Sequence, residues 1–178
     1  MIPVSSAEDS LQTLYKMIIL YILDRVDFPI TRVQVADFMQ KKGYLSYLAV
    51  QSIFSKLSEA GLITQEKKLN KTILSITDEG RETLSLFQNE ITAEIKKDIN
   101  EYLRSNAMSL REKTAAGADY IKSADGGYSV NLSLSEHGNT ILDISVSMPT
   151  EELAKSACEK WQSCHEEIYS SVMSYLLG

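Results

Sequence analysis

Residues 46–79 constrain the fold of this chain more than any other part of its sequence. Apolar residues recur at helical spacing in the first half, so we expect a helix with one buried and one exposed face. Ser46 precedes this pattern and can cap the first turn, and Gly61 follows it with the freedom to adopt a left-handed conformation. The apolar positions are Val50, Ile53, Phe54 and Leu57.

The second half of this stretch predicts a short β-hairpin. Leu62 and Ile63 begin one strand, residues 67–71 form a polar and basic turn, and residues 72–76 return as the second strand. A helix followed directly by a basic hairpin is the layout of a winged helix-turn-helix. In that layout the helix enters the major groove of DNA and the hairpin lies along the neighbouring backbone.

The residue types on both elements suit this role. Small polar side chains allow close approach to base edges, whereas lysines contact phosphates without reading sequence. We expect base contacts from Tyr47, Gln51, Ser52 and Ser55, with Gln51 the best partner for adenine. We expect phosphate contacts from Arg32, Lys42, Lys56, Lys67, Lys68 and Lys71. The alternative is that the hairpin lysines form only a solvated edge that opposes aggregation.

The distribution of charge favours a nucleic-acid surface, although the chain as a whole is acidic. The 178 residues carry a formal net charge of −6. Residues 28–76 contain seven basic and three acidic side chains, which leaves a local charge of +4. A basic segment within an acidic chain is typical of a protein with one surface for nucleic acid.

Further helices are predicted on either side of this stretch. A wide apolar stripe predicts the first helix over residues 11–26, after a loose arm over residues 1–9. Thr31 caps a second helix over residues 32–42. Thr77, followed by two acidic residues, caps a fourth helix whose apolar positions continue for roughly 25 residues, which predicts one long helix.

From Met108 onwards the apolar pattern changes to a period of two residues, which predicts β-strands. Turn sequences at residues 125–127 and 137–139 divide this region into a three-stranded antiparallel meander with one apolar face. Pro149 stops the last strand, and Thr150 caps a final helix over residues 151–177, whose apolar stripe is expected to cover the sheet.

These elements predict an α+β fold in three parts. A winged helix-turn-helix DNA-binding domain occupies residues 1–80, a linking helix residues 81–107, and the antiparallel β-meander with its C-terminal helix residues 108–178. The third part is expected to dimerise, to sense a ligand, or to do both, and the sequence leaves these alternatives open.

Two motifs of the N-terminal part resemble the MarR and PadR groups of bacterial winged-helix repressors. They are Leu57-x-x-x-Gly61-Leu62-Ile63 before the hairpin and Ser75-Ile76-Thr77-x-x-Gly80 after it. The resemblance covers roughly residues 11–80 and implies a winged-helix regulator. Beyond Gly80 the chain departs from both groups, which dimerise through helices and lack the meander.

The whole chain resembles a bacterial family catalogued as a domain of unknown function. This family combines an N-terminal winged helix with a β-meander and a C-terminal helix. The resemblance is carried by the junction Met148-Pro149-Thr150 and by the segment Ala157-Cys158-Glu159-Lys160-Trp161. It implies a transcriptional regulator with no assigned ligand.

The sequence lacks the common motifs of enzymes and metal sites. Gly126-Gly127 is a hairpin turn rather than a phosphate-binding loop, and neither a nucleophile elbow nor a His-Glu-x-x-His helix occurs. Cys158, Cys164 and His165 lie in one predicted helix, but zinc needs about four convergent ligands and no fourth is near. We therefore expect no enzymatic activity, no cofactor and no metal.

The sequence also predicts a cytoplasmic protein. No apolar run approaches the roughly 20 residues of a membrane helix, and the acidic N-terminal residues are unlike a signal peptide. Two cysteines are too few for a disulfide framework and suit a reducing compartment.

The predicted function is a DNA-binding transcriptional regulator that binds double-stranded DNA as a homodimer. A dimer is expected because it reads two half-sites about one helical turn apart. A small-molecule effector remains an open alternative for the C-terminal part. The rival hypothesis is a protein-interaction or ligand-sensing module that uses a winged helix without DNA.

Overall fold

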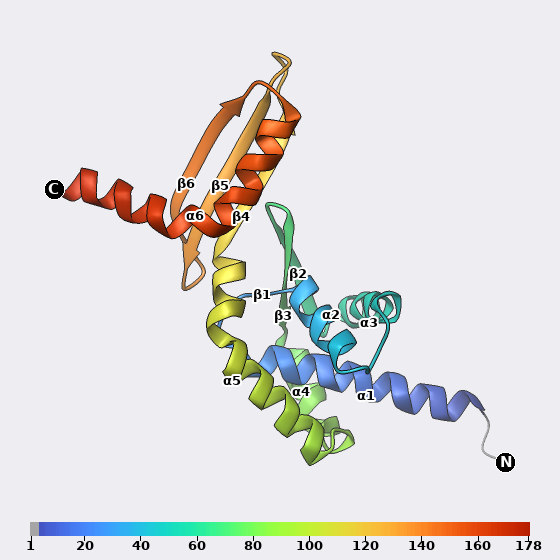
Figure 1. The fold of residues 1–178 in the computed structure, drawn as a ribbon. Coiled ribbons are helices and arrows are strands. Elements are labelled where there is room, and N and C mark those ends of the chain that lie inside the picture. Colours follow the sequence, from blue (N-terminus) through green and yellow to red (C-terminus); the bar gives the residue numbers. More distant parts are fainter. Residues whose placement is uncertain (1–3) are drawn as a thin grey trace. The chain divides into compact units, whose positions relative to one another are not determined.

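The computed structural model describes residues 4–178, with side chains from Ala7 onwards. Over this range it contains six α-helices, one short 3-10 helix and two three-stranded antiparallel sheets (Figure 1). The predicted α+β class is therefore confirmed. The chain divides into two compact units, the first formed by Met1–Glu66 and Thr72–Leu110 and the second by Lys67–Lys71 and Arg111–Gly178.

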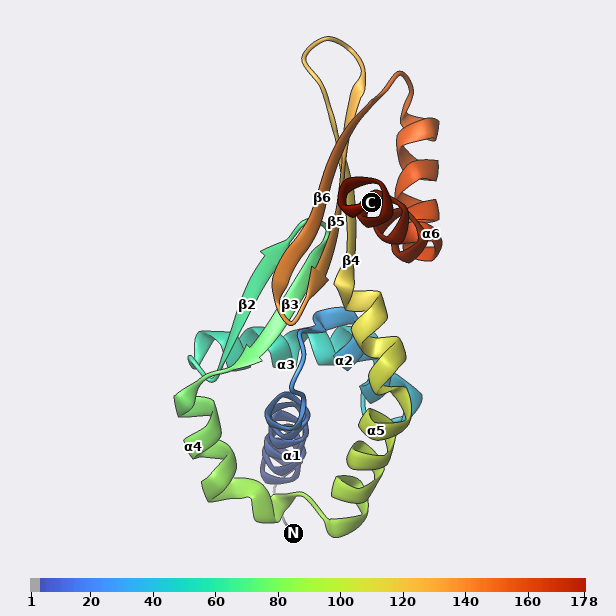
Figure 2. The ribbon, with the colours of Figure 1, turned by 90° about the vertical axis from the view of Figure 1, so that its left-hand side faces the viewer.

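The first unit is a helical bundle with a small sheet. Figure 2 looks along α1, which lies between α4 and α5. Residues 17–23 of α1 are buried on all sides, as expected for a helix at the centre of a bundle. The elements are α1 (Val4–Arg25), β1 (Ile30–Thr31), α2 (Arg32–Lys41), α3 (Tyr47–Glu59), β2 (Ile63–Lys68), β3 (Lys71–Ile76), α4 (Asp78–Phe87), η1 (Gln88–Glu90) and α5 (Ala93–Ala115).

Side chains cap the helices where the sequence predicts it. The Thr31 hydroxyl accepts from the Gln34 amide at 3.2 Å, and the Gln34 side chain accepts from the Thr31 amide at 2.8 Å, which completes a capping box. Ser46 accepts from Ala49 at the start of α3, and Gly61 after α3 has φ +72°. The predicted caps at these residues are confirmed.

The first helix begins earlier than predicted. α1 starts at Val4, whereas the sequence predicted a loose arm over residues 1–9, of which residues 1–3 lie outside the described range. Residues 7–10 are exposed, so this first part of the helix lies beyond the apolar stripe. Hydrophobic periodicity reports burial, and it therefore misses helical turns that bury nothing.

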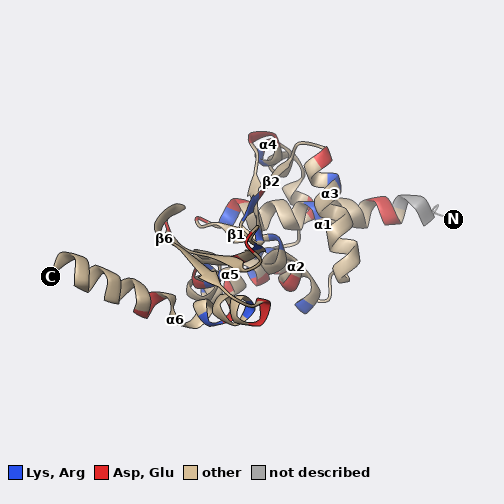
Figure 3. Cartoon of the chain, turned by 90° about the horizontal axis from the view of Figure 1, so that it is seen from above, with Lys and Arg blue, Asp and Glu red and all other residues tan. Residues whose placement is uncertain are grey.

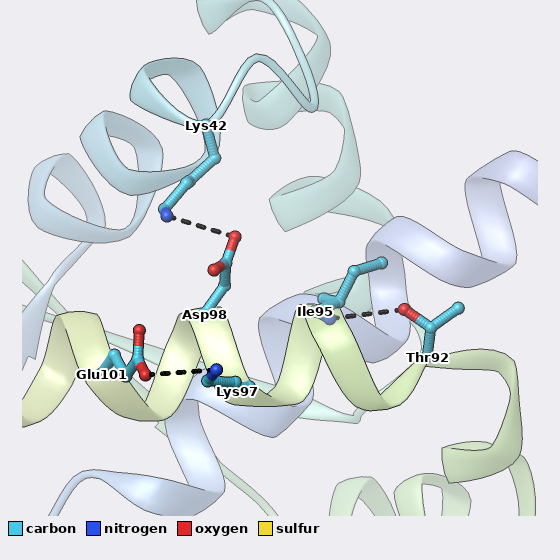
Figure 4. Close-up of polar contacts among 6 residues, drawn as sticks. All are labelled: Lys42, Thr92, Ile95, Lys97, Asp98 and Glu101. Atoms are coloured by element: carbon cyan, nitrogen blue, oxygen red, sulfur yellow. Dashed lines mark hydrogen bonds and ion pairs between the residues drawn. The ribbon is translucent and has the colours of Figure 1, made fainter.

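The predicted long fourth helix is two helices, which corrects that prediction. α4 ends at Phe87, and α5 starts at Ala93 after η1. Ile91 has an extended conformation there and is only 3% exposed, so the break turns its side chain into the core. The Thr92 hydroxyl then accepts from the Ile95 amide at 3.3 Å and begins the new helix (Figure 4).

The small sheet of the first unit has the strand order β1-β3-β2. The two residues of β1 pair antiparallel with β3, Ile30 opposite Leu74 and Thr31 opposite Ile73. The sequence predicted only a helix break at this point, because a two-residue strand has no periodicity of its own. β1 fixes the start of α2 against the hairpin.

The second unit contains the predicted three-stranded meander and its helix. Its elements are β4 (Ala116–Lys122), β5 (Tyr128–Glu136), β6 (Asn139–Met148) and α6 (Glu151–Leu177), with strand order β4-β5-β6. The strands begin later than predicted, because α5 continues to Ala115 where the sequence indicated strand from Met108 onwards.

α6 covers one face of this sheet through Trp161, which is 1% exposed and donates from Nε1 to the Ser133 carbonyl at 3.0 Å. The helix bends part-way along (Figures 1 and 2). His165, near its middle in sequence, has Nδ1 2.9 Å from the Trp161 carbonyl oxygen. A side chain that competes for a helical carbonyl in this way is a known cause of helix bending.

Candidate nucleic-acid interface

α3 has one buried and one exposed face, as its spacing predicts. Its four predicted apolar positions are at most 4% exposed. On the opposite face Ser52, Ser55 and Lys56 are exposed, and Tyr47 is 48% exposed. Gln51 lies at the margin of this face and is half-buried. The four predicted base-contact residues therefore all lie along one helix.

Leu48, which is not among the predicted contact residues, is the most exposed apolar residue of α3. Its side chain is 80% exposed beside Tyr47 in the first turn of the helix. The signal was present in the sequence, because Leu48 lies outside the apolar stripe of the helix. A leucine with so little burial contributes little to the core, and together with Tyr47 it makes the first turn of this face partly apolar.

Arg32, at the start of α2, is held against α3 and β2. Its Nε donates to Gln51 Oε1 at 2.5 Å and its Nη1 donates to Gln65 Oε1 at 3.0 Å. The guanidinium also lies over the Phe54 ring, 5.3 Å from its centroid. These contacts fix the direction of a permanent positive charge next to the exposed face of α3.

Two of the predicted phosphate-contact lysines form polar contacts within the first unit. Lys42 Nζ lies 3.2 Å from Asp98 Oδ2 of α5, an ion pair drawn in Figure 4 together with the Lys97–Glu101 pair. Lys56 Nζ donates to Gln12 Oε1 of α1 at 2.8 Å. The charge of Lys42 is thus partly balanced, whereas Lys56 has a neutral partner and keeps its charge on the α3 face.

The hairpin lysines differ in their surroundings. Lys67 and Lys68 are exposed at the end of β2, and the turn comprises only residues 69–70, which corrects the predicted turn over residues 67–71. Lys71 is half-buried, and its ammonium donates to the carbonyls of Lys113 and Ala116 within the second unit, which includes residues 67–71. Because Lys67 and Lys68 are more exposed than Lys71, they are the better candidates for phosphate contact. Figure 3 shows acidic as well as basic positions on the helices around α3.

Replacement of Lys71 by methionine is expected to change the pH dependence of stability. Burial lowers the pKa of the Lys71 ammonium below its usual 10.5, so between the folded pKa and 10.5 the unfolded chain binds more protons. The free energy of unfolding of the natural chain should therefore rise with pH across this window relative to Lys71→Met. Urea unfolding from about pH 8 to about pH 10.5 measures this difference, and a constant difference would contradict the assignment.

The cysteines and His165 of α6 are largely covered by protein. His165 is 7% exposed, and Cys158 and Cys164 are half-buried. Burial, together with the nearby carboxylates of Asp119 and Glu159, raises the pKa of the Cys158 thiol. Within residues 4–178 no three metal-ligating side chains lie close enough together to hold an ion. In the same range, no helix has the length and apolarity required to cross a membrane.

A family model described as Domain of unknown function (DUF4364) matches residues 15–176. The chain belongs to this family. The match confirms the predicted membership of a domain-of-unknown-function family and spans the elements from α1 to α6. Comparison with curated proteins and with solved structures gave no match.

Proposed function

We propose that the first unit of this DUF4364 chain is a winged-helix DNA-binding domain and that the protein regulates transcription. Three helices, a two-residue strand between the first two, and a hairpin after the third follow one another in the order of a winged helix-turn-helix. In this proposal α3 enters the major groove and the hairpin follows the DNA backbone.

The observation that carries the proposal is the exposed face of α3 with Arg32 fixed beside it. Ser52 and Ser55 are short enough to bring the helix close to base edges, and Tyr47 extends from its first turn. Arg32 uses two of its five N–H donors on Gln51 and Gln65. Its guanidinium is thereby oriented for a bidentate contact with guanine or a phosphate.

The role proposed for the Gln51 side chain differs from the predicted contact with adenine. Its oxygen accepts from Arg32, so it positions the guanidinium rather than pointing alone towards adenine. The donor end of its amide remains suited to a base edge. Phosphate contacts are assigned to the exposed Lys56, Lys67 and Lys68, with weaker contributions from Lys42, whose charge is balanced by Asp98, and from the half-buried Lys71.

Selection of fragments from the genome of the source organism by the purified chain tests the proposal. We expect enrichment of a shared motif, and Ser52→Asp should weaken binding to that motif by roughly 10- to 100-fold, because it sets a negative charge into the groove of a polyanion at a position assigned to base edges. The matched control is Ser85→Asp, which adds the same charge to an exposed helical position on α4 and should leave binding unchanged.

Salt titration separates the hairpin from the helix. The double variant Lys67→Ala/Lys68→Ala should weaken binding to all sequences alike. The slope of the logarithm of the binding constant against the logarithm of the salt concentration should fall in magnitude by about 1–2. Arg32→Lys keeps the charge but loses the planar fork, so it should reduce discrimination between sequences more than non-specific affinity. Absence of any enriched motif, or equal effects of Ser52→Asp and Ser85→Asp, would contradict DNA reading by α3.

The exposure of Leu48 favours one alternative, a protein-interaction module built on the same face of α3. An 80% exposed leucine beside a half-exposed tyrosine suits an apolar partner surface. This alternative predicts no DNA enrichment. It becomes the favoured function if two results are found together. The natural chain shows no salt-dependent DNA binding, and Leu48→Ser abolishes its capture of a defined protein partner.

A further inference from the structure

The outer edge of β6 is unpaired within the described part of the chain. The strand order β4-β5-β6 makes β6 an edge strand, and it extends over ten residues. Such an edge presents a row of backbone donors and acceptors that another strand can use. Proteins usually protect long edges with lysine, proline or several charges, but residues 140–148 contain one charged side chain, Asp143.

The helix-facing side of β6 is incompletely covered. Leu142, Ile144 and Met148 pack against the core of the second unit but remain half-buried, and Val146 is 36% exposed. On β5, by contrast, Val130, Leu132 and Leu134 are at most 9% exposed. The apolar face of the sheet therefore extends to the β6 edge beyond the cover that α6 gives it.

α6 extends past this same edge. Its 27 residues correspond to about 40 Å, and after the bend its last turns project on the β6 side of the sheet (Figures 1 and 2). The apolar stripe that packs on the sheet continues along this projection at helical spacing, although Tyr175 is 91% and Leu176 74% exposed. Ile168, Val172, Tyr175 and Leu176 form a shallow, mostly apolar surface there, together with Glu167 and Ser171 of the same helix.

We propose that a second copy of this chain occupies this surface, by antiparallel pairing of β6 with β6 of the partner. The pairing joins the two sheets into one of six strands. The two-fold axis leaves both α6 helices on the same face, and each projecting end covers the exposed apolar row of the other sheet. The interface is isologous and closes after two copies.

The sequence of β6 is compatible with its own antiparallel copy. A bulge opposite Leu134 and Ser135 confines regular β5–β6 pairing to residues 142–148, and the centre of that segment is Ser145. A two-fold axis at Ser145 sets Asp143 against Ser147 and Ile144 against Val146 of the other copy. No like charges then face each other, and the apolar residues form cross-strand pairs.

The mass of the full chain in solution, measured by light scattering, tests the proposal. We expect a dimer. Val146→Lys on the edge strand and Tyr175→Glu/Leu176→Glu on the projecting helix should each raise the dissociation constant by roughly 100-fold. Matched controls are Ile121→Lys on the opposite edge strand β4 and Leu86→Glu/Met108→Glu, all at exposed positions, which should remain dimeric.

Disulfide cross-linking tests the register. Ser145→Cys should form a covalent dimer under mild oxidation, because Ser145 faces its own copy at a Cα separation of about 4.5–5.5 Å. Ser147→Cys should not, because the two cysteines would lie four residues apart along the strands, about 13 Å. The natural chain, which retains Cys158 and Cys164, measures the background of cross-linking through these two cysteines.

A monomeric natural chain would overturn this proposal, as would a dimer that survives both variants and lacks the Ser145 cross-link. These experiments need no DNA, so their outcome is independent of the proposed DNA binding. If both proposals hold, dimerisation supplies the two reading helices that a palindromic operator requires.

Discussion

Replacement of Trp161 by alanine is expected to destabilise the second unit by about 3–5 kcal/mol, which is most of the stability of a domain of this size. The buried apolar residues of this unit form a cluster of seven, and Trp161 is the largest of them. Its loss leaves a cavity and also removes the partner of the Ser133 carbonyl. The meander and α6 are therefore expected to separate.

Urea unfolding followed by circular dichroism, with amide hydrogen exchange over β4–β6, measures this effect. In the natural chain, fluorescence follows the second unit selectively, because the sequence contains one tryptophan. Trp161→Phe retains a ring but loses the N–H donor and should cost about 1–2 kcal/mol. Leu153→Ala, at a half-exposed position of the same helix, should change stability by less than about 0.5 kcal/mol. A Trp161→Ala cost similar to that of Leu153→Ala would show that α6 is not anchored by this side chain.

Replacement of Gly80 by alanine is expected to destabilise the first unit by about 1–3 kcal/mol, although alanine is the better helix former by about 1 kcal/mol. A Cβ atom at this position would lie 2.2 Å from the Leu62 carbonyl oxygen and 2.8 Å from Ile76 Cγ1. The same carbonyl accepts from the Thr77 amide at 3.1 Å, so it is not free to move away. The glycine permits α4 to start directly against the backbone of Leu62, between α3 and β2.

Thermal and urea unfolding of Gly80→Ala measure this cost. Ser85→Ala is the matched control, because it lies on the exposed side of the same helix and should be neutral or slightly stabilising. Unchanged stability of Gly80→Ala would mean that the Leu62 backbone yields without cost. The motif ending in Gly80 would then lack the packing role that the structure assigns to it.

Local signals in the sequence predicted much of this fold. Thr31, Ser46, Thr77 and Thr150 cap helices as predicted, because a cap depends on residues within one turn. The period of two residues predicted β5 and β6, and the turn at residues 125–127 lies where their neighbour β4 ends. The exposed polar face of α3 followed from the spacing of its buried residues.

Features that depend on distant partners could not be predicted in this way. β1 exists through its pairing with β3, and the break before α5 exists because Ile91 reaches the core. The hydrogen bond from Arg32 to Gln51 joins residues 19 apart in the sequence, and the contacts of Lys71 join residues more than 40 apart. Nothing in either local sequence specifies these pairs.

The sequence by itself thus determined the starts of α2, α3, α4 and α6, the hairpin, the meander and the residues of the candidate reading face, because periodicity and capping are short-range properties. Only the tertiary structure decided which polar groups of that face are already engaged, and which edge of the second sheet lacks a neighbour. Those outcomes depend on packing between elements far apart in the chain, where burial and pairing are settled by the whole fold rather than by any one segment.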